Sequence, residues 1–573
     1  MRRTATTLAR RHFGFAGLAH LKTPSDWDAA ATKATAAALT HAAALRNGKD
    51  RDPLRTLRLL DAASVALCGV LDPAALCVAA HDCEDWRTAA LRAADRVEGV
   101  MEELNANAAL ATAAAECASA KNLPTSARRL ADAFHKEFSR DGAPGVAAAR
   151  LAERQAVRHV FETNFDASAS WTRVPCFDAT LVARAVEAAA PGCAHASGNH
   201  VDLFTMGAAV STFLTVSDDA YARKIVFDHH EAALSLEALD ALASARRNVA
   251  TAQTALEGSL IGGVEAAKAF VDGALRDAQR RAAFERRKGA ALLGLDRLEP
   301  SDLLAAAHRL RGHAPVTAAG DVVATVCVAP PGFTVDEVPC AADEAWAPGV
   351  RKLVITGRAT RATIYLDLGP RPGKPRGCAH YTVTCACDIN GGDSFPAETW
   401  GLDSPSRLPA VGAIISSSYD ERALAHEWGH ALHGALHRST SQHLAGTRGS
   451  TDAAELPSTA LERLAPGDWR RRNAARGLES VAALRGAVFD LALHGAYGDG
   501  CDVAAALALA DARAGAGRRA DIIDWLPHVA EAPAALYAYP FGRARADALW
   551  RRPDAEDELL RVLEGDEGRA LYW

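Results

Sequence analysis

The residues best suited to chemistry in this 573-residue chain form the pattern HEWGH, from His426 to His430. Histidines four apart lie on one face of an α-helix, about one turn from each other. Two neutral imidazoles at that spacing can occupy two corners of a tetrahedral Zn²⁺ site. Glu427 follows the first histidine and can reach a zinc-bound water as its general base. The pattern therefore predicts one zinc ion per chain, held by His426 and His430, with Glu427 as a catalytic residue.

A catalytic zinc needs a third protein ligand and an open position for water. Glu455 lies in a predicted helix after a glycine-containing loop, and such a helix can return antiparallel to the first. His433 is the rival ligand, because it continues the face of the first two histidines. We favour Glu455, since one straight helix reaches three corners of a tetrahedron with difficulty. Asp452 either supports a ligand histidine or caps the helix that begins near residue 453.

Helical patterning must position these residues. Apolar residues three and four apart extend from about residue 23 to 313. Short strands are expected at 350–357, 362–369 and 380–387, and helices return from about 420 nearly to the end. These elements predict a mainly α protein of two lobes, with a small sheet beside the helix at 420–437. We expect a helical N-terminal lobe at 21–313 and a catalytic region at 314–573.

The first 20 residues have the composition of a targeting segment. They contain Arg2, Arg3, Arg10 and Arg11, and the first acidic residue is Asp26. An Arg-rich, acid-free start without a long apolar run is typical of an organellar transit peptide, here a mitochondrial one at 1–20. An ordinary basic N-terminus is the alternative.

The overall composition excludes several classes of protein. Hydrophobic residues make up 49% and charged residues 23% of the chain, so long disorder is not expected. A net charge of -6 argues against nucleic-acid binding, and no uninterrupted apolar run has the length of a membrane span. The 12 cysteines are scattered, which indicates free thiols in a reducing compartment. We interpret Cys385 and Cys387 as two strand residues on one face.

Three segments resemble the thimet-oligopeptidase-like family of zinc metallopeptidases, and more closely its mitochondrial intermediate peptidase branch. They are ALAHEWGHALH at 423–433, GTRGSTDAAELPS at 446–458 and IYLDLGPRPGKPRGCAHYTV at 364–383. The similarity covers most of the chain and is loose over residues 190–320. It implies two helical lobes around a deep channel, with zinc on the channel floor bound by His426, His430 and Glu455.

The resemblance also assigns roles near the C-terminus. HVAEAPAALYAY at 528–539 is similar to a family segment with a histidine and a tyrosine eleven residues apart. It implies that His528 binds substrate and that Tyr539 stabilises the transition state, as donors aimed at a developing oxyanion. The family has further tyrosines where this chain has Ala532 and Leu536, and the C-terminus is shorter, which puts the level of activity in question.

These features predict a zinc-dependent metalloendopeptidase that acts on short or extended peptides. The favoured activity is removal of N-terminal octapeptides from imported precursors in the mitochondrial matrix. The alternatives are a general oligopeptidase that degrades free peptides, in another organelle or the cytosol, and a catalytically weakened peptide-binding relative. We expect a peptide or unfolded precursor as the partner, no nucleic acid, no membrane span and a monomer. The basic segment RPGKPRG at 371–377 is interpreted as a solvated turn.

Overall fold

The computed structural model describes the chain between residues 13 and 565, with gaps. The described residues are 13–47, 52–141, 146–161, 163, 170–190, 192–205, 207–232, 235–247, 251–312, 319–358, 360–369, 371, 374, 377–387, 408–417, 420–464, 473–498, 502–515, 525, 528–530 and 532–565. The statements below concern these residues.

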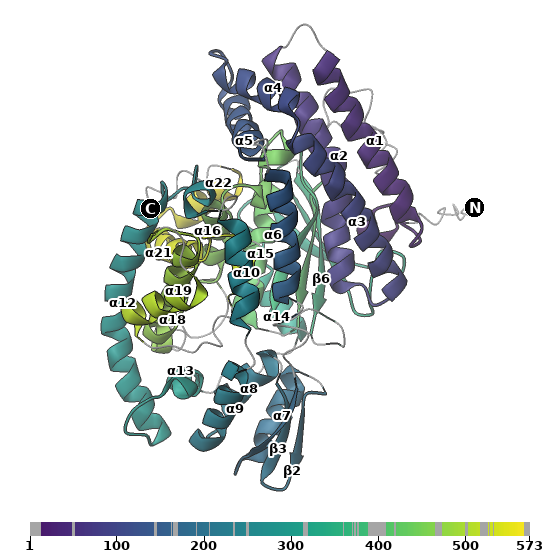
Figure 1. The fold of residues 1–573 in the computed structure, drawn as a ribbon. Helices are drawn as coiled ribbons and strands as arrows, with labels where there is room; N and C mark the ends of the chain where they lie inside the picture. Colours follow the sequence, from purple (N-terminus) through teal and green to yellow (C-terminus); the bar gives the residue numbers. More distant parts are fainter. Residues whose placement is uncertain are drawn as a thin grey trace, which may run out of the picture.

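The first lobe consists of long helices around a single core. Helix α2 begins after Asp52, whose carboxylate accepts a hydrogen bond from the backbone N–H of Arg55 at 3.0 Å. Pro53 stands at the first helical position, where its missing N–H has no cost. Figure 1 shows these helices at one end of the molecule. Their bounds are α1 (Asp26–Asn47), α2 (Pro53–Ala80), α3 (Glu84–Asn105), α4 (Ala108–Ser119) and α5 (Thr125–Asp141), whereas α6 (Val146–Phe161) packs into the second helical core described below.

Residues 171–232 form a small α/β unit with its own core. Three antiparallel strands pair in the order β1-β3-β2 and pack against three helices. The sequence analysis expected helices here, because strands of four or five residues are too short to show a clear periodicity. The elements are β1 (Trp171–Pro175), α7 (Ala179–Ala189), β2 (Ala194–Ser197), β3 (His200–Phe204), α8 (Gly207–Val216) and α9 (Ala220–Ala232).

A second helical core joins segments that are far apart in the chain. Its helices are α10 (Leu236–Arg246), α11 (Ala252–Ala255), α12 (Val264–Leu293), α13 (Leu303–Arg311), α18 (Arg476–Leu493) and α19 (Val503–Ala514). In Figure 1 the long α12 lies along α18 and α19, on the opposite side of the molecule from α1. Core packing therefore crosses residue 313, where the two expected domains meet.

A five-stranded sheet lies beside the helix that carries HEWGH. The strand order is β4-β5-β6-β8-β7, with β6 and β8 parallel and the other pairs antiparallel. The three expected strands are confirmed as β5, β6 and β7, but β8 lies between β6 and β7. The strands are β4 (Thr334–Val338), β5 (Arg351–Gly357), β6 (Thr360–Leu368), β7 (Cys378–Thr384) and β8 (Val411–Ser416).

The helices around this sheet complete this half of the molecule. They are α14 (Ala319–Val326), α15 (Glu421–Leu436), α16 (Thr451–Leu461), α21 (Ala538–Leu549) and α22 (Ala555–Leu563). The short 3₁₀ helices are η1 (Phe15–Gly17), η3 (Pro300–Asp302), η5 (Gln442–Leu444), η6 (Gly446–Arg448) and η7 (Asn473–Ala475). The predicted fold class is confirmed: the protein is mainly α, with two helical lobes and a small sheet next to α15.

The segment from Phe13 to Leu21 packs into the first lobe. Phe15 is 2% exposed and Leu18 is 4% exposed. The ring centroid of Phe15 lies 5.9 Å from that of Trp346, a residue far away in the sequence. The first twelve residues of the predicted transit segment lie outside the described residues. The remaining part, 13–20, belongs to the folded body.

Helix α2 is long and apolar enough, by length and composition alone, to cross a membrane. Half of its apolar window is buried in the protein, where it packs against α1, α3 and β7. A core helix of this length meets the same criteria, so the feature is explained by packing within the described part of the chain.

Candidate metal centre and catalytic site

Helix α15 presents the HEWGH residues because its start and its neighbour are both well defined. Asp420 caps the helix, and its carboxylate accepts a hydrogen bond from the backbone N–H of Ala423 at 2.6 Å. Gly429 faces α16, where an added Cβ would lie 2.4 Å from the Cα of Ser458. Only glycine allows the two helix backbones to approach this closely. The contact brings α16 and its Glu455 over the histidine face of α15.

The structure brings His426, His430 and Glu455 together, as the sequence analysis expected. The Nε2 atom of His426 lies 3.0 Å from one carboxylate oxygen of Glu455, and the Nε2 atom of His430 lies 3.6 Å from the other. Ligand atoms about 2.0–2.1 Å from a tetrahedral zinc lie about 3.3–3.4 Å apart. Two imidazole nitrogens and a carboxylate with these spacings fit a zinc ion. Among the described residues, this is the cluster whose ligand atoms converge in this way.

The second ring nitrogen of His426 contacts a residue outside the motif. Its Nδ1 atom lies 2.9 Å from Glu462, two helical turns after Glu455 on the same side of α16. A carboxylate at Nδ1 holds the imidazole with Nδ1 protonated and Nε2 free to bind a metal. Arg422 and Arg543 in turn donate hydrogen bonds to Glu462. Glu462 therefore fixes the ring orientation of His426, a candidate ligand.

Charges within the cluster shift the titration of its members. Burial alone would lower the pKa of His426, but the carboxylates of Glu455 and Glu462 outweigh it and raise this pKa to about 10. Burial would raise the pKa of Glu455, but the two histidines hold it well below its usual range. The same opposition, with Arg543 as the main favourable charge, lowers the pKa of Glu462. The carboxylates are thus ionised and ready to bind a cation.

Glu427 lies buried beside the cluster, and its carboxylate accepts a hydrogen bond. Its carboxylate accepts a hydrogen bond from the backbone N–H of His380, on β7, at 2.8 Å. Burial raises the pKa of Glu427 above its usual value, against the opposing effect of the nearby histidines. A raised pKa strengthens a carboxylate as a proton acceptor, which suits a general base. Strand β7 is an edge of the sheet, so this contact also places the edge next to the cluster.

His528 and Tyr539 contact each other beside the cluster of His426, His430 and Glu455. The Tyr539 hydroxyl lies 3.0 Å from the Nδ1 atom of His528, and the ring of Tyr539 lies 6.0 Å from that of His426. Burial, followed by the negative charges of Glu455 and Glu427, raises the pKa of Tyr539 well above its usual value. Burial lowers the pKa of His528. The pair is therefore a protonated phenol and a neutral imidazole at neutral pH.

A buried polar network holds the segment that carries this pair. Asp490, which is fully buried in α18, accepts hydrogen bonds from the backbone N–H groups of Ala534 and Leu536 at 3.0 and 2.9 Å. Arg246 of α10 donates hydrogen bonds to the carbonyls of Val529 and Ala530. These contacts tie both ends of the turn to the helical core.

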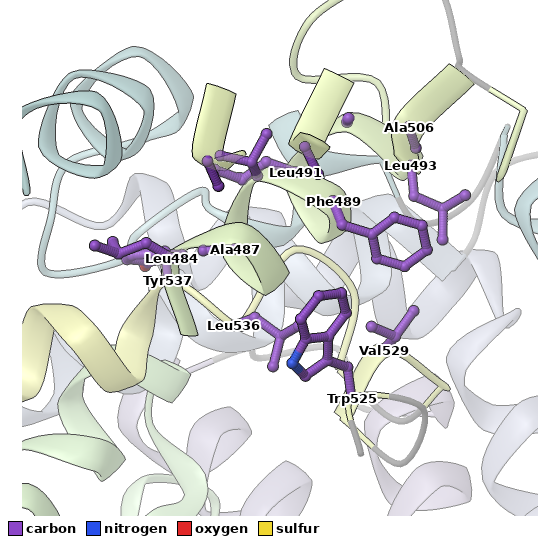
Figure 2. Close-up of a cluster of buried hydrophobic side chains, with 14 of the residues drawn as sticks. Leu484, Ala487, Phe489, Leu491, Leu493, Ala506, Trp525, Val529, Leu536 and Tyr537 are labelled. Carbon is purple, nitrogen blue, oxygen red and sulfur yellow. The ribbon is translucent and has the colours of Figure 1, made fainter. Parts of the chain in front are cut away.

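Apolar packing supports the same segment. Figure 2 shows Trp525, Val529 and Leu536 packed against side chains of α18. The ring of Trp525 lies 5.8 Å from that of Phe489. The segment is therefore joined to α18 by apolar contacts as well as by the hydrogen bonds of Asp490.

The alternatives from the sequence analysis take other places. His433 is fully buried and lies next to His437, with 5.4 Å between ring centroids, and it is outside the convergent cluster. Asp452 neither contacts a ligand histidine nor caps a helix. Its carboxylate accepts hydrogen bonds from the backbone N–H of Ile261 and the hydroxyl of Tyr537, both at 2.9 Å.

The basic segment after β6 is not a solvated turn where it is described. Arg371 and Lys374 both bind the carboxylate of Asp367, at 2.6 and 2.9 Å. The side chain of Lys374 is fully buried. The prediction of a solvated turn was therefore wrong for these two residues, because a buried aspartate at the end of β6 attracts both cations. Arg376 lies outside the described residues.

The cluster opens into a cavity of about 640 Å³. Its walls come from β7, α15, α16, α18 and the segment that ends in α21. Leu536 lines it, at a position where the family resemblance led us to expect a tyrosine. This cavity lies where the sequence analysis expected a channel, and the candidate metal ligands and Glu427 lie on its wall.

Sequence reasoning missed three supporting residues. Glu462 had a local signal, since it follows Glu455 by seven residues and so lies on the same helical face. His380 and Asp490 had none, because their backbone-directed contacts join segments 47 and 44 residues apart.

Comparison with known proteins finds a family model that matches the part of the chain around this site. Residues 241–509 match the model of Peptidase family M3, which includes the whole convergent cluster and Glu427. His528 and Tyr539 lie outside the matched residues.

Curated relatives match over shorter stretches. The mitochondrial intermediate peptidase of Aspergillus oryzae is 35% identical over 158 residues, which cover 22% of this chain and 20% of the relative. The protein of the same name from Pleurotus djamor is 32% identical over 168 residues, covering 23% and 21%. The chain thus matches about a fifth of the length of these relatives. Among solved structures, oligoendopeptidase-F from Enterococcus faecium has a TM-score of 0.48 and 11% identity, covering 96% of both chains.

Proposed function

We propose that this chain, whose residues 241–509 match the model of Peptidase family M3, is a zinc-dependent metalloendopeptidase. His426, His430 and Glu455 are the proposed ligands of one zinc ion. The observation that carries the proposal is the convergence of their three ligand groups next to the buried carboxylate of Glu427. The chemistry supplied by such an ion, when bound, is polarisation of the scissile carbonyl and activation of water.

The residues of this chain account for the proton transfers. Glu427 takes the proton of the attacking water at a carboxylate oxygen and passes it to the leaving amine. The backbone N–H of His380 donates a hydrogen bond to one carboxylate oxygen of Glu427, and this bond fixes the orientation of the carboxylate. The Tyr539 hydroxyl, kept protonated by its raised pKa, donates to the oxyanion that develops on the carbonyl. His528 orients this hydroxyl through their 3.0 Å contact.

For the substrate, we propose removal of N-terminal octapeptides from imported precursors in the mitochondrial matrix. The similarity to mitochondrial intermediate peptidases supports this choice, together with the basic composition of residues 1–12. Degradation of free oligopeptides is the second candidate, since a cavity of this size also accepts short peptides. A precursor-derived peptide and unrelated peptides of equal length, cleaved side by side, separate the two.

The primary test compares the wild type with Glu427→Gln and Glu421→Gln. The second variant makes the same change on the same helix, outside the cluster. We expect about one zinc per chain in all three proteins, and hydrolysis of a quenched peptide by the wild type and Glu421→Gln only. Zinc without hydrolysis in the wild type would favour a peptide-binding relative, with Leu536 as the first suspect.

The ligand assignment has its own test. Glu455→Gln is expected to lose zinc, whereas His433→Gln is expected to retain it. The reverse result would make His433 the third ligand.

A further inference from the structure

The catalytic cavity shares a wall with a second cavity. The second one, of about 400 Å³, lies between α12, α16, α18 and α21. Four residues line both: Arg422, Glu462, Ala483 and Arg543. A peptide bound at the candidate zinc site therefore lies next to two guanidinium groups that line both cavities.

These two arginines have hydrogen-bonding capacity to spare. Arg422 donates to Glu462 at 2.7 Å and to Glu479 at 3.4 Å, and Arg543 donates to Glu462 at 3.3 and 3.4 Å. Among the described residues, Nη2 of Arg422 and Nη1 of Arg543 contact no acceptor. Their side chains are 41% and 37% exposed, so the free edges reach the cavity.

The acceptors on this wall are already shared. Glu462 binds both arginines and His426. Glu479 binds Arg422 and also Arg311. Three arginines, Arg311, Arg422 and Arg543, therefore share the two carboxylates of Glu462 and Glu479, which favours an additional anionic partner.

We propose that Arg422 and Arg543 form a subsite for a substrate carboxylate. This inference rests on the proposed peptidase function and specifies its substrates. The path from His426 through Glu462 to the guanidinium groups is on the order of 10 Å, which an extended peptide covers in about three residues. The carboxylate is then either the C-terminus of a short peptide or an acidic side chain about three residues from the cleaved bond. The first source fits free oligopeptides, and the second also fits a long precursor.

The test uses six quenched peptides of one sequence. The third residue from the cleaved bond is Gln on both sides or Glu on one side only, and each of these three forms is made with a C-terminal acid and with a C-terminal amide. We expect kcat/KM of the wild type to be about fivefold or more higher for one acid than for its neutral partner. Arg422→Gln and Arg543→Gln each reduce this ratio towards one. Arg281→Gln, at the far end of the second cavity only, leaves it unchanged.

The ratio is informative even if the variants lose activity in general, because both peptides of a pair are affected alike. Equal cleavage of every acid and its neutral partner overturns the subsite while the peptidase function stands. If no peptide is cleaved, the peptidase function fails. The subsite is then decided by binding of the same peptides to Glu427→Gln, where equal dissociation constants for acid and neutral forms overturn it.

Discussion

The histidines of HEWGH depend on carboxylates that lie outside the motif. His426 contacts Glu455 through one ring nitrogen and Glu462 through the other. Two carboxylates on one imidazole explain why its pKa is raised to about 10 although it is buried. Each carboxylate has a different task, since Glu455 faces the candidate metal position and Glu462 fixes the ring orientation.

Removing the supporting carboxylate therefore weakens metal binding without removing a ligand. We expect Glu462→Gln to lower zinc affinity about 10- to 100-fold, as for other supporting residues of metal-bound histidines. Competition with a chromophoric chelator measures this change. Glu479→Gln, which alters the same arginine network but does not contact His426, is the control and is expected to keep the wild-type affinity. Equal affinities for all three proteins would contradict the assigned role of Glu462.

Between elements, the contact of α15 with α16 sets the distance from the histidines to Glu455. This contact depends on Gly429, because an added Cβ would lie 2.4 Å from backbone atoms of Ser458. Backbone cannot move aside as the end of a flexible side chain can. The two helices must therefore separate to accept any larger residue.

Gly429→Ala is accordingly expected to reduce both zinc content and the melting temperature. Gly434→Ala on the same helix is a matched control, since its added Cβ meets no atom within 4 Å. Alanine there is expected to be neutral or to stabilise by up to about 1 kcal/mol, because it favours the helix. Zinc analysis and thermal unfolding of both variants provide the comparison. Full zinc content in Gly429→Ala would show that the close approach is not required.

Packing of the first lobe also makes the folding stability of the protein depend on pH through a buried histidine. Burial lowers the pKa of His81 to about 4, and its Nδ1 atom accepts a hydrogen bond from the backbone N–H of Cys83. The unfolded chain takes up a proton near pH 6.5 and the folded protein only near pH 4. The unfolded state thus binds more protons in this window, and stability falls as the pH drops from about 6.5 to 4, by at most about 3 kcal/mol.

His81→Asn is expected to remove this part of the pH dependence, since the asparagine oxygen can still accept from Cys83. Denaturant unfolding at pH 7 and pH 5 measures the difference. His135→Asn, at an exposed position, should retain the wild-type loss of stability. An unchanged acid response in His81→Asn would assign the response to other groups.

Across the molecule, the N-terminal segment joins the first lobe to residues near the sheet. Phe15 and Leu18 are buried, and Phe15 packs near Trp346. Any processing of the N-terminus that preserves this core must occur at or before Phe13. The transit segment at 1–20 stays a prediction, and its residues 13–20 pack against the first lobe in the structure.

A protein that begins at Phe13 is expected to unfold at the same temperature as the full chain. One that begins at Leu21 loses the buried side chains of Phe15, Ala16 and Leu18 and several kcal/mol of stability, since truncating a buried phenylalanine to alanine alone costs about 3–5 kcal/mol. Thermal unfolding of the two truncated proteins tests this. Equal midpoints would show that residues 13–20 are dispensable for the core.

Local spacing was sufficient to predict part of the fold and of the site. The four-residue spacing of His426 and His430 follows from helical geometry, and the patterns of β5, β6 and β7 follow from side-chain alternation. Glu455 was chosen over His433 from the limits of a single helix and from family resemblance. Each of these inferences needed only residues that are close in the chain or a motif already known.

Long-range placement required the folded structure. The insertion of β8 between β6 and β7, and the contacts of Asp490 and Arg246 with the segment before Tyr539, join parts of the chain that no local pattern relates. Backbone groups carry no residue signature, so their partners leave no trace in the sequence. Helical periodicity shows which face of α15 carries His426 and His430. Only packing decides which carboxylates and which arginines contact that face.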